Sequence, residues 1–178
     1  LDAGPLSDFL GVPAVEVSGR VYPVALTHAP RSDSRRLEDQ VVSATQALLT
    51  EGLEGHVLVF LPGTGEIRAC EGALRGLARR EDLRVLPLHG RLPRGAITQA
   101  LEPSAQRKVI LATNVAESSL TIPGVEAVID SGLAREAGTS VRTGLPTLQL
   151  VPIAKSSAIQ RAGRAGREAP GRCRRLYT

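Results

Sequence analysis

A strand, a turn and a helix follow one another in Val57-Leu58-Val59-Phe60-Leu61-Pro62-Gly63-Thr64-Gly65-Glu66-Ile67. The run before Pro62 is apolar throughout, which is typical of a strand in a parallel sheet that helices cover on both faces. The turn also presents the N-terminal amides of the following helix, and such amides can bind an anion. The stretch has no Gly-Lys-Ser/Thr sequence, so it is not a Walker A phosphate loop, and a plain strand–turn–helix connection fits it equally well.

The same alternation repeats along the chain. We expect strands at Ala14–Val17, Tyr22–Thr27, His56–Leu61, Arg84–Leu88, Lys108–Ala112 and Val125–Asp130. Helical periodicity predicts helices at Ser34–Glu51, Thr64–Arg80 and Pro93–Leu101. Residues 133–153 contain Gly138, Gly144 and Pro146 between β-like stretches, which predicts a β-hairpin. Strands alternating with helices indicate an α/β fold with a mainly parallel, helix-covered sheet and this hairpin appended to it.

The composition fits one globular domain. The 178 residues include 42% hydrophobic side chains, too many for general disorder, and only 2% aromatic ones, so Leu, Val, Ile and Ala must form the core. No apolar run approaches the roughly 20 residues of a membrane span. The sequence shows no signal peptide, and therefore no sign of secretion.

Positive charge is concentrated near the C-terminus. From Arg135 to Thr178 there are nine Lys or Arg and two Glu, a net charge of +7, and the remaining residues carry −3. This imbalance suggests an anionic partner such as phosphate or nucleic acid, although a solvated basic surface explains it as well. Neither Cys70 nor Cys173 lies in a metal-binding motif, and the three histidines lack metal-ligand spacing, so we expect no metal site. Two free thiols are favoured, with a disulfide left open.

The most specific motif is Gln160-Arg161-Ala162-Gly163-Arg164-Ala165-Gly166-Arg167. On a helix, Gln160, Arg164 and Arg167 would share one narrow face, with Arg161 about 100° away. The two glycines would lie opposite and indicate close approach to another backbone, because a glycine inside a helix costs roughly 1 kcal/mol. Two guanidiniums and an amide on one face suit the charge of a transferring phosphoryl group. An exposed arginine-rich helix is the alternative.

A second motif is Ala112-Thr113-Asn114-Val115-Ala116-Glu117-Ser118-Ser119-Leu120-Thr121-Ile122. It begins at the carboxyl end of a predicted strand, where ligands bind in open α/β sheets. Its short polar side chains and amides can hold phosphate without crowding it. A polar strand-to-helix loop explains the segment equally well.

Together these segments resemble the second RecA-like lobe of DEAH-box helicases of superfamily 2. Motif VI of that family is similar to Gln160–Arg167, motif V to Ala112–Ile122, motif IV to Val57–Ile67, and the block between motifs IV and V to Leu88-His89-Gly90-Arg91-Leu92-Pro93. Within the family the chain most resembles the bacterial HrpB-type helicases, on Leu61-Pro62-Gly63 and the stretch from Val17 to Val24. The resemblance implies a RecA-like, P-loop NTPase-type fold, an ATP-dependent RNA helicase activity and a cytoplasmic location in a bacterium.

The resemblance also assigns roles to single residues. It implies catalytic roles toward the γ-phosphate of ATP for Gln160, Arg164 and Arg167, and nucleotide sensing for Ser119 and Thr121. It implies contacts with the RNA backbone for Gly63, Thr64, Thr113 and Asn114. The hairpin at 133–153 would project toward the nucleic-acid path. Arg161, which points elsewhere, should brace the fold or contact the motif V segment.

Most of the implied enzyme lies outside this chain. Leu1-Asp2 matches the residues that directly follow the Ser-Ala-Thr motif of the first lobe in relatives. The P-loop and the acidic box, which bind ATP and Mg²⁺, belong to that lobe, so we expect residues 1–178 to be a single lobe that is inactive alone. The expected partners are single-stranded RNA, with DNA left open, and the first lobe and C-terminal accessory domains of the same polypeptide. The alternative is a non-catalytic RNA-binding or protein-interaction module derived from a helicase lobe.

Two residues depart from the family pattern. Leu101 precedes Glu102-Pro103 where relatives often carry an aromatic residue that stacks on the nucleotide base, which leaves the base preference open. Pro123 stands where relatives often have an acidic residue, which removes one expected nucleotide contact.

Overall fold

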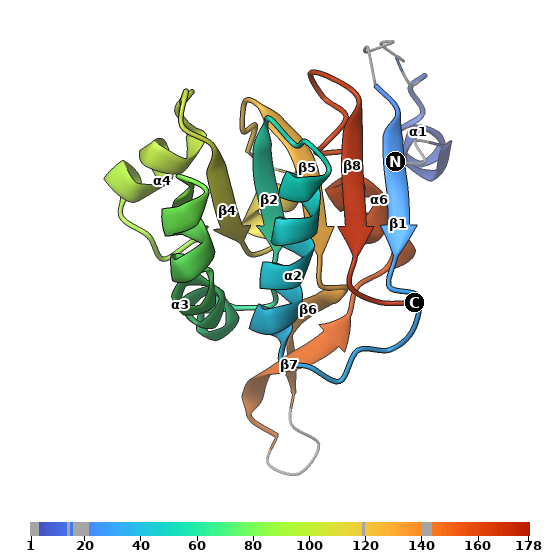
Figure 1. Ribbon diagram of the computed structural model, residues 1–178. Coiled ribbons are helices and arrows are strands. Elements are labelled where there is room, and N and C mark those ends of the chain that lie inside the picture. Colours follow the sequence, from blue (N-terminus) through green and yellow to red (C-terminus); the bar gives the residue numbers. More distant parts are fainter. Residues whose placement is uncertain (1–3, 14, 16–21, 119, 140–143) are drawn as a thin grey trace.

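The computed structural model describes residues 4–13, 15, 22–118, 120–139 and 144–178 (Figure 1). The helices are α1 (Gly4–Leu10), α2 (Leu37–Thr50), α3 (Thr64–Arg80), α4 (Arg94–Leu101), α5 (Val115–Ser118) and α6 (Lys155–Ala162). The strands are β1 (Val24–His28), β2 (His56–Phe60), β3 (Arg84–Leu88), β4 (Lys108–Ala112), β5 (Val125–Asp130), β6 (Leu133–Thr139), β7 (Pro146–Pro152) and β8 (Gly171–Arg175).

Six strands form one sheet in the order β1-β8-β5-β2-β4-β3, and all neighbours are parallel. Their carboxyl ends therefore meet at one edge, the end toward which the arrows point in Figure 1. Strands β6 and β7 form a separate antiparallel hairpin, which extends beyond that edge. The predicted α/β fold with an appended hairpin is confirmed.

Apolar residues fill both faces of the sheet. Val57, Val59 and Leu61 belong to a buried cluster with α2 and α3, whereas Leu58 and Phe60 belong to a second cluster with α4, α5 and α6. The continuous apolar run of β2 follows from this arrangement, because a strand alternates its side chains between two faces that are both dry. The core is aliphatic, as the composition predicts.

Most predicted elements are observed within a few residues of their expected bounds. The helix expected at Ser34–Glu51 begins later, at Leu37, and the strand expected at Tyr22–Thr27 is β1. The strand expected at Ala14–Val17 falls mainly outside the described residues.

Strand β8 was not predicted from the sequence, and it lies between β1 and β5 in the sheet. Its sequence is Gly-Arg-Cys-Arg-Arg, which looks like a basic loop. Gly171 and Cys173 are buried, and Arg172 and Arg174 lie at the side of the sheet covered by α2, where they pair with Glu126 and Glu51. The strand is stabilised by neighbours on both sides, so local propensity did not reveal it.

Candidate functional site

The residues expected to bind RNA lie at the carboxyl edge of the sheet. Gly63 and Thr64 follow β2, Thr113 and Asn114 follow β4, and these two strands are neighbours. The amide of Leu61 donates to the carbonyl of Ala112 at 2.8 Å, which continues the pairing to the start of both segments. The structure therefore brings the four predicted residues to one edge, where Asn114 is exposed, Thr64 and Thr113 are half-buried and Gly63 is buried.

An arginine of the hairpin covers Gly63. Arg135 at the start of β6 forms an ion pair with Glu66 of α3 at 2.9 Å. A Cβ atom at position 63 would lie 2.8 Å from Nε of Arg135, so the arginine would have to shift if another residue replaced this glycine. Sequence reasoning did not single out Arg135, because its position beside Gly63 depends on the hairpin folding back toward α3.

A hollow of about 220 Å³ opens at the same edge. It is lined by Asn114 and Glu117 from the motif V segment, by Ala134 and Glu136 of the hairpin, and by Ile153, Ala154, Ser157 and Arg161 near α6. Ser157 donates a hydrogen bond to a carboxylate oxygen of Glu117 at 2.5 Å. The hollow thus joins a predicted RNA contact to the base of the hairpin and to α6.

Arg161 holds these elements together. Its side chain is 1% exposed, and its guanidinium pairs with Glu117 at 3.1 Å and with the fully buried Asp130 at 2.9 Å. It also donates to the carbonyl of Leu133 at 3.3 Å and lies 4.9 Å from the centre of the Phe60 ring. The expectation that Arg161 contacts the motif V segment is confirmed, because Glu117 belongs to it. A buried arginine paired with two carboxylates fixes the mutual position of α5, α6, β5 and the hairpin.

The carboxylate of Asp130 has further partners at the end of β5. It accepts a hydrogen bond from the amide of Gly132 at 3.0 Å and one from the hydroxyl of Tyr177 at 3.4 Å. Burial, together with the charge of Asp130, raises the pKa of Tyr177 to about 12. Gly132 has a φ of +72°, and a Cβ atom there would lie 2.4 Å from the Tyr177 ring, so this position requires glycine.

The prediction that Gln160, Arg164 and Arg167 share one helix face is wrong. Helix α6 ends at Ala162 with Gly163 as its C-cap, and the residues that follow form turns. Glycine is poorly suited to continue a helix, so Gly163 allows the chain to leave it. A Cβ atom at Gly163 would make only ordinary contacts, whereas one at Gly166 would lie 2.6 Å from the carbonyl oxygen of Tyr22. The predicted close backbone approach therefore exists at Gly166 alone.

The turn after α6 places Arg164 against the motif V segment. Its guanidinium donates to the carbonyl of Glu117 through Nε at 3.0 Å and through Nη2, and to the carbonyl of Leu120 through Nη1. Arg164 is 6% exposed, and burial and the neighbouring Arg167 lower its pKa although Glu117 opposes the shift. Each Nη atom keeps a second N–H that these bonds do not use. Arg164 is therefore held in a fixed orientation by the segment that it contacts.

The remaining predicted nucleotide contacts are more open. Arg167 is exposed and donates to the hydroxyl of Thr121 at 2.9 Å, which brings two predicted residues together. Gln160 is exposed on the last turn of α6, and its side chain makes no hydrogen bond to any described residue. Ser119 lies outside the described residues. Leu101 packs partly buried against the second core cluster.

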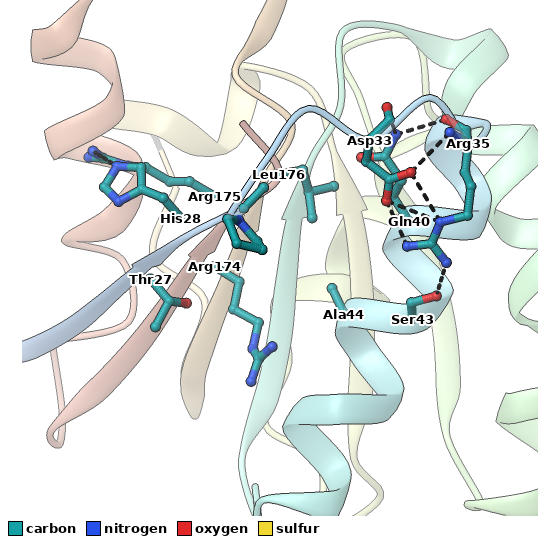
Figure 2. A pocket seen from close by; sticks show the side chains of 12 residues that line it. Thr27, His28, Asp33, Arg35, Gln40, Ser43, Ala44, Arg174, Arg175 and Leu176 are labelled. Carbon is teal, nitrogen blue, oxygen red and sulfur yellow. Dashed lines mark hydrogen bonds and ion pairs between the residues drawn. The ribbon is translucent and has the colours of Figure 1, made fainter. Parts of the chain in front are cut away.

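A second polar hollow lies at the carboxyl ends of β1 and β8, with a volume of about 230 Å³ (Figure 2). Its charged groups bind one another: Arg35 pairs with Asp33 and donates to Ser43 at 2.9 Å, and Arg175 lies 3.1 Å from a ring nitrogen of His28. The Arg35 side chain beside Asp33 holds the pKa of that carboxyl below its usual value. The guanidiniums of this hollow are thus bound within the lobe.

The described residues contain no group of three or more His, Cys, Asp or Glu side chains placed to hold a metal ion. Cys70 and Cys173 are free, buried thiols in different core clusters, and burial raises the pKa of each to about 12. Over the part of the chain that the structure describes, no helix combines the length and apolar character needed to cross a membrane.

The family described as the helicase conserved C-terminal domain matches residues 40–169. The chain belongs to this family. Over 174 residues it is 40% identical to the ATP-dependent RNA helicase HrpA of Escherichia coli, a match that covers 96% of this chain and 13% of that protein. Two crystal structures of HrpB from E. coli, described as a DExH-box NTPase and as a DEAH/RHA helicase, each align with a TM-score of 0.87 and 39% identity.

These HrpB alignments cover the whole of this chain but only 22% and 23% of the HrpB chains. The helicase lobe therefore spans less than a quarter of the relatives that it matches. The resemblance to the DEAH-box helicases is confirmed over nearly the entire chain, and so is the fold that it implies.

Proposed function

We propose that residues 1–178 are the second RecA-like lobe of an ATP-dependent DEAH-box RNA helicase. In this proposal Gln160, Arg164 and Arg167 contact the phosphates of ATP bound between this lobe and a first lobe of the same polypeptide. The edge formed by Gly63, Thr64, Thr113 and Asn114 contacts the backbone of single-stranded RNA. C-terminal domains of the same polypeptide would complete the enzyme.

The position of Glu117 carries this proposal. Its carboxylate accepts hydrogen bonds from Ser157 and Arg161 beside the hollow that contains Asn114, whereas its main-chain carbonyl binds Arg164. The short helix α5 thus directly follows the predicted RNA contacts Thr113 and Asn114 in the chain, and through Glu117 it is bonded to a predicted phosphate contact, Arg164. A shift of either group must be transmitted through these bonds or break them, which is the coupling that an ATP-driven helicase needs.

Within the lobe each residue has a distinct part. The exposed Arg167 supplies a planar charge to the γ-phosphate, and its bond to Thr121 orients it before the nucleotide arrives. Arg164 supplies its unused N–H groups once the lobes close, while its carbonyl contacts report that closure to the motif V segment. We assign Ser119 and Thr121 to the sensing of nucleotide state, and Gln160 to the orientation of the attacking water.

The backbone contacts of the RNA edge favour little base specificity, because phosphate and sugar groups carry no sequence information directly. The hairpin at 133–153 would lie beside this RNA, since Arg135 covers Gly63 and Glu136 lines the hollow near Asn114. We assign the Mg²⁺ ligands to the first lobe, as the resemblance to the DEAH-box helicases implies. Bound there with ATP, Mg²⁺ would neutralise charge on the phosphates.

Arg167→Ala tests the proposal in a polypeptide that joins this lobe to its first lobe. We expect RNA-stimulated ATP hydrolysis to fall by about 10³-fold or more in kcat, the usual effect of removing an arginine that contacts the γ-phosphate. The free energy of unfolding should be nearly unchanged, because Arg167 is exposed. Arg164→Ala is less informative, since it also removes the bonds to Glu117 and Leu120.

Arg31→Ala is the matched control, because Arg31 is also exposed and lies in the loop before α2. Its kcat should equal that of the unaltered protein. The isolated 178-residue chain should show no hydrolysis, since half of the site is missing from it. A kcat for Arg167→Ala close to that of the control would reject the phosphate contact and favour a non-catalytic RNA-binding module.

A further inference from the structure

The solvent-facing side of α3 consists of arginine and glycine alone. Helix α3 buries Ile67, Cys70, Leu74 and Leu77 against the sheet. On the opposite side, six exposed residues fall within an arc of about 100° at the usual helical rotation. They are Gly65, Arg68, Gly72, Arg75, Gly76 and Arg79. We call this set the α3 arginine face.

The arginine side chains of this face have no partners among the described residues. Those of Arg68, Arg75 and Arg79 make no hydrogen bond, ion pair or ring contact there. Of the two acidic residues of α3, Glu66 is bound by Arg135, and Glu71 forms no ion pair with any described residue. Three unpaired guanidiniums on one face form a strong positive patch whose charge the fold does not use.

The glycines of the face are not required by packing. A Cβ atom would meet nothing within 4 Å at Gly65 and Gly72, and at Gly76 only the Arg80 side chain at 4.0 Å. Each glycine within the helix costs roughly 1 kcal/mol relative to alanine. What they provide is a low surface between the arginines, on which the backbone of a ligand can lie close to the helix.

We propose that the α3 arginine face is a second nucleic-acid contact, on which Arg68, Arg75 and Arg79 bind the phosphates of the strand held at the carboxyl edge. This rests on the proposed function. Arginine contacts without apolar neighbours favour phosphates over a protein, because protein interfaces have an apolar centre. The α3 arginine face contains no apolar side chain.

The position of α3 favours the same ligand. The helix begins at Thr64, one of the residues of the predicted RNA edge, and runs back along the sheet from the end where the hairpin lies (Figure 1). Arg68 and Arg79 are eleven helical steps apart, which is about 16 Å at the usual helical rise. A strand that leaves the edge at Thr64 can therefore follow the helix across all three arginines.

Arg75→Gln/Arg79→Gln tests this surface in the polypeptide that carries both lobes, without nucleotide. These two positions lie far from the edge. Their loss should therefore reduce the affinity for a long single strand and leave the affinity for a strand of about 6 nucleotides unchanged. Loss of two phosphate contacts should make the slope of log K against log salt less steep by about 1.4. Over a tenfold increase in salt, the affinity of the variant should therefore fall about 25-fold less than that of the unaltered protein. Binding is measured by fluorescence anisotropy with a labelled RNA of about 30 nucleotides, which is long enough to contact both the edge and α3.

Arg31→Gln/Arg36→Gln is the control of equal charge change on another surface, and its salt slope should match that of the unaltered protein. Failure of the unaltered protein to bind RNA would overturn the proposal. An unchanged slope for Arg75→Gln/Arg79→Gln in a protein that does bind RNA would also overturn it, and would point to an acidic protein as the partner. Loss of affinity for the short strand as well would also overturn it, since the effect would not be local to α3. If the unaltered two-lobe protein does not hydrolyse ATP but Arg75→Gln/Arg79→Gln still reduces the salt slope, the proposed function is rejected and the α3 contact stands.

Discussion

Arg161 and Arg164 beside α6 and Arg75 and Arg79 on α3 are the same kind of side chain in opposite surroundings. The first pair is almost fully buried, and every guanidinium has partners in the lobe. The second pair is exposed and unpaired within the described residues. Both pairs lie on or next to helices that begin at the carboxyl edge of the sheet or close to it.

The difference distinguishes arginines that position neighbouring groups from arginines that are available to bind a ligand. A buried guanidinium that has lost water must be paired, so it fixes the geometry of whatever pairs with it. An exposed guanidinium keeps its hydration and its freedom, and it gains a partner only when an anionic ligand arrives. The lobe uses arginine in both ways, and Arg167, which is exposed with one bond to Thr121, lies between them.

Arg161→Met should give the largest change in stability. It leaves Asp130 buried without its charge partner, and breaking such a buried pair costs about 3–5 kcal/mol. Urea unfolding measures this as a lower midpoint with an unchanged slope. Arg75→Met is the matched change on α3 and should shift the free energy of unfolding by less than about 0.5 kcal/mol, since an exposed unpaired side chain is replaced. Equal losses from the two variants would contradict the contrast between the pairs.

Gly166→Ala and Gly76→Ala should have opposite signs. At Gly166 the added methyl group would lie 2.6 Å from the Tyr22 carbonyl and 2.7 Å from Val24, so β1 must move and stability should fall by about 1–3 kcal/mol. At Gly76 the methyl group has open space on an exposed helix face, and stability should rise by about 0.5–1 kcal/mol. Thermal unfolding of both variants measures the two shifts. A destabilised Gly76→Ala protein would mean that α3 packs against something in the lobe that its exposure does not show.

The smallest effect should appear as a pH dependence near Asp130. The pKa of Tyr177 is raised from its ordinary value of 10 to about 12, so the folded state binds the phenol proton more tightly than the unfolded state. The resulting stability is fully present below pH 10 and is lost as pH rises through about 12. Tyr177→Phe should show a smaller decline, because only the buried thiols Cys70 and Cys173, whose pKa values are also raised to about 12, would still contribute to it. Urea unfolding at a series of pH values measures the difference. Tyr22→Phe, at the only other tyrosine, should retain the full decline, and identical profiles for the two variants would contradict the assignment.

Sequence patterns predicted β2, β3, β4 and β5 and the long helices because each is locally consistent. β2 is apolar at four of its five positions, and α3 alternates buried and exposed residues with helical period. Patterns failed at β8 and at the end of α6. β8 is made almost entirely of glycine and arginine, and its place between β1 and β5 depends on partners distant in the sequence.

The candidate site was predicted in outline. The motif similarity brought Gly63, Thr113 and Asn114 to attention, and the parallel sheet places them at one edge. It did not show that α6 stops at Ala162, so the shared helix face of Arg164 and Arg167 does not exist. It also missed Asp130 and Arg135, whose roles arise from contacts across 31 and 69 positions of the chain.

By itself the sequence determined the family, the α/β class and the candidate residues for phosphate contacts, because apolar periodicity and a long specific motif are local properties of the chain. Only the tertiary structure decided which arginines are bonded within the fold and which remain exposed to a ligand. That division depends on burial and on the nearest carboxylates and carbonyls, which the folded chain brings together from distant positions. Arginine therefore stabilises the fold as a buried ion pair at Arg161 and remains an exposed, unpaired charge at Arg75 among the described residues.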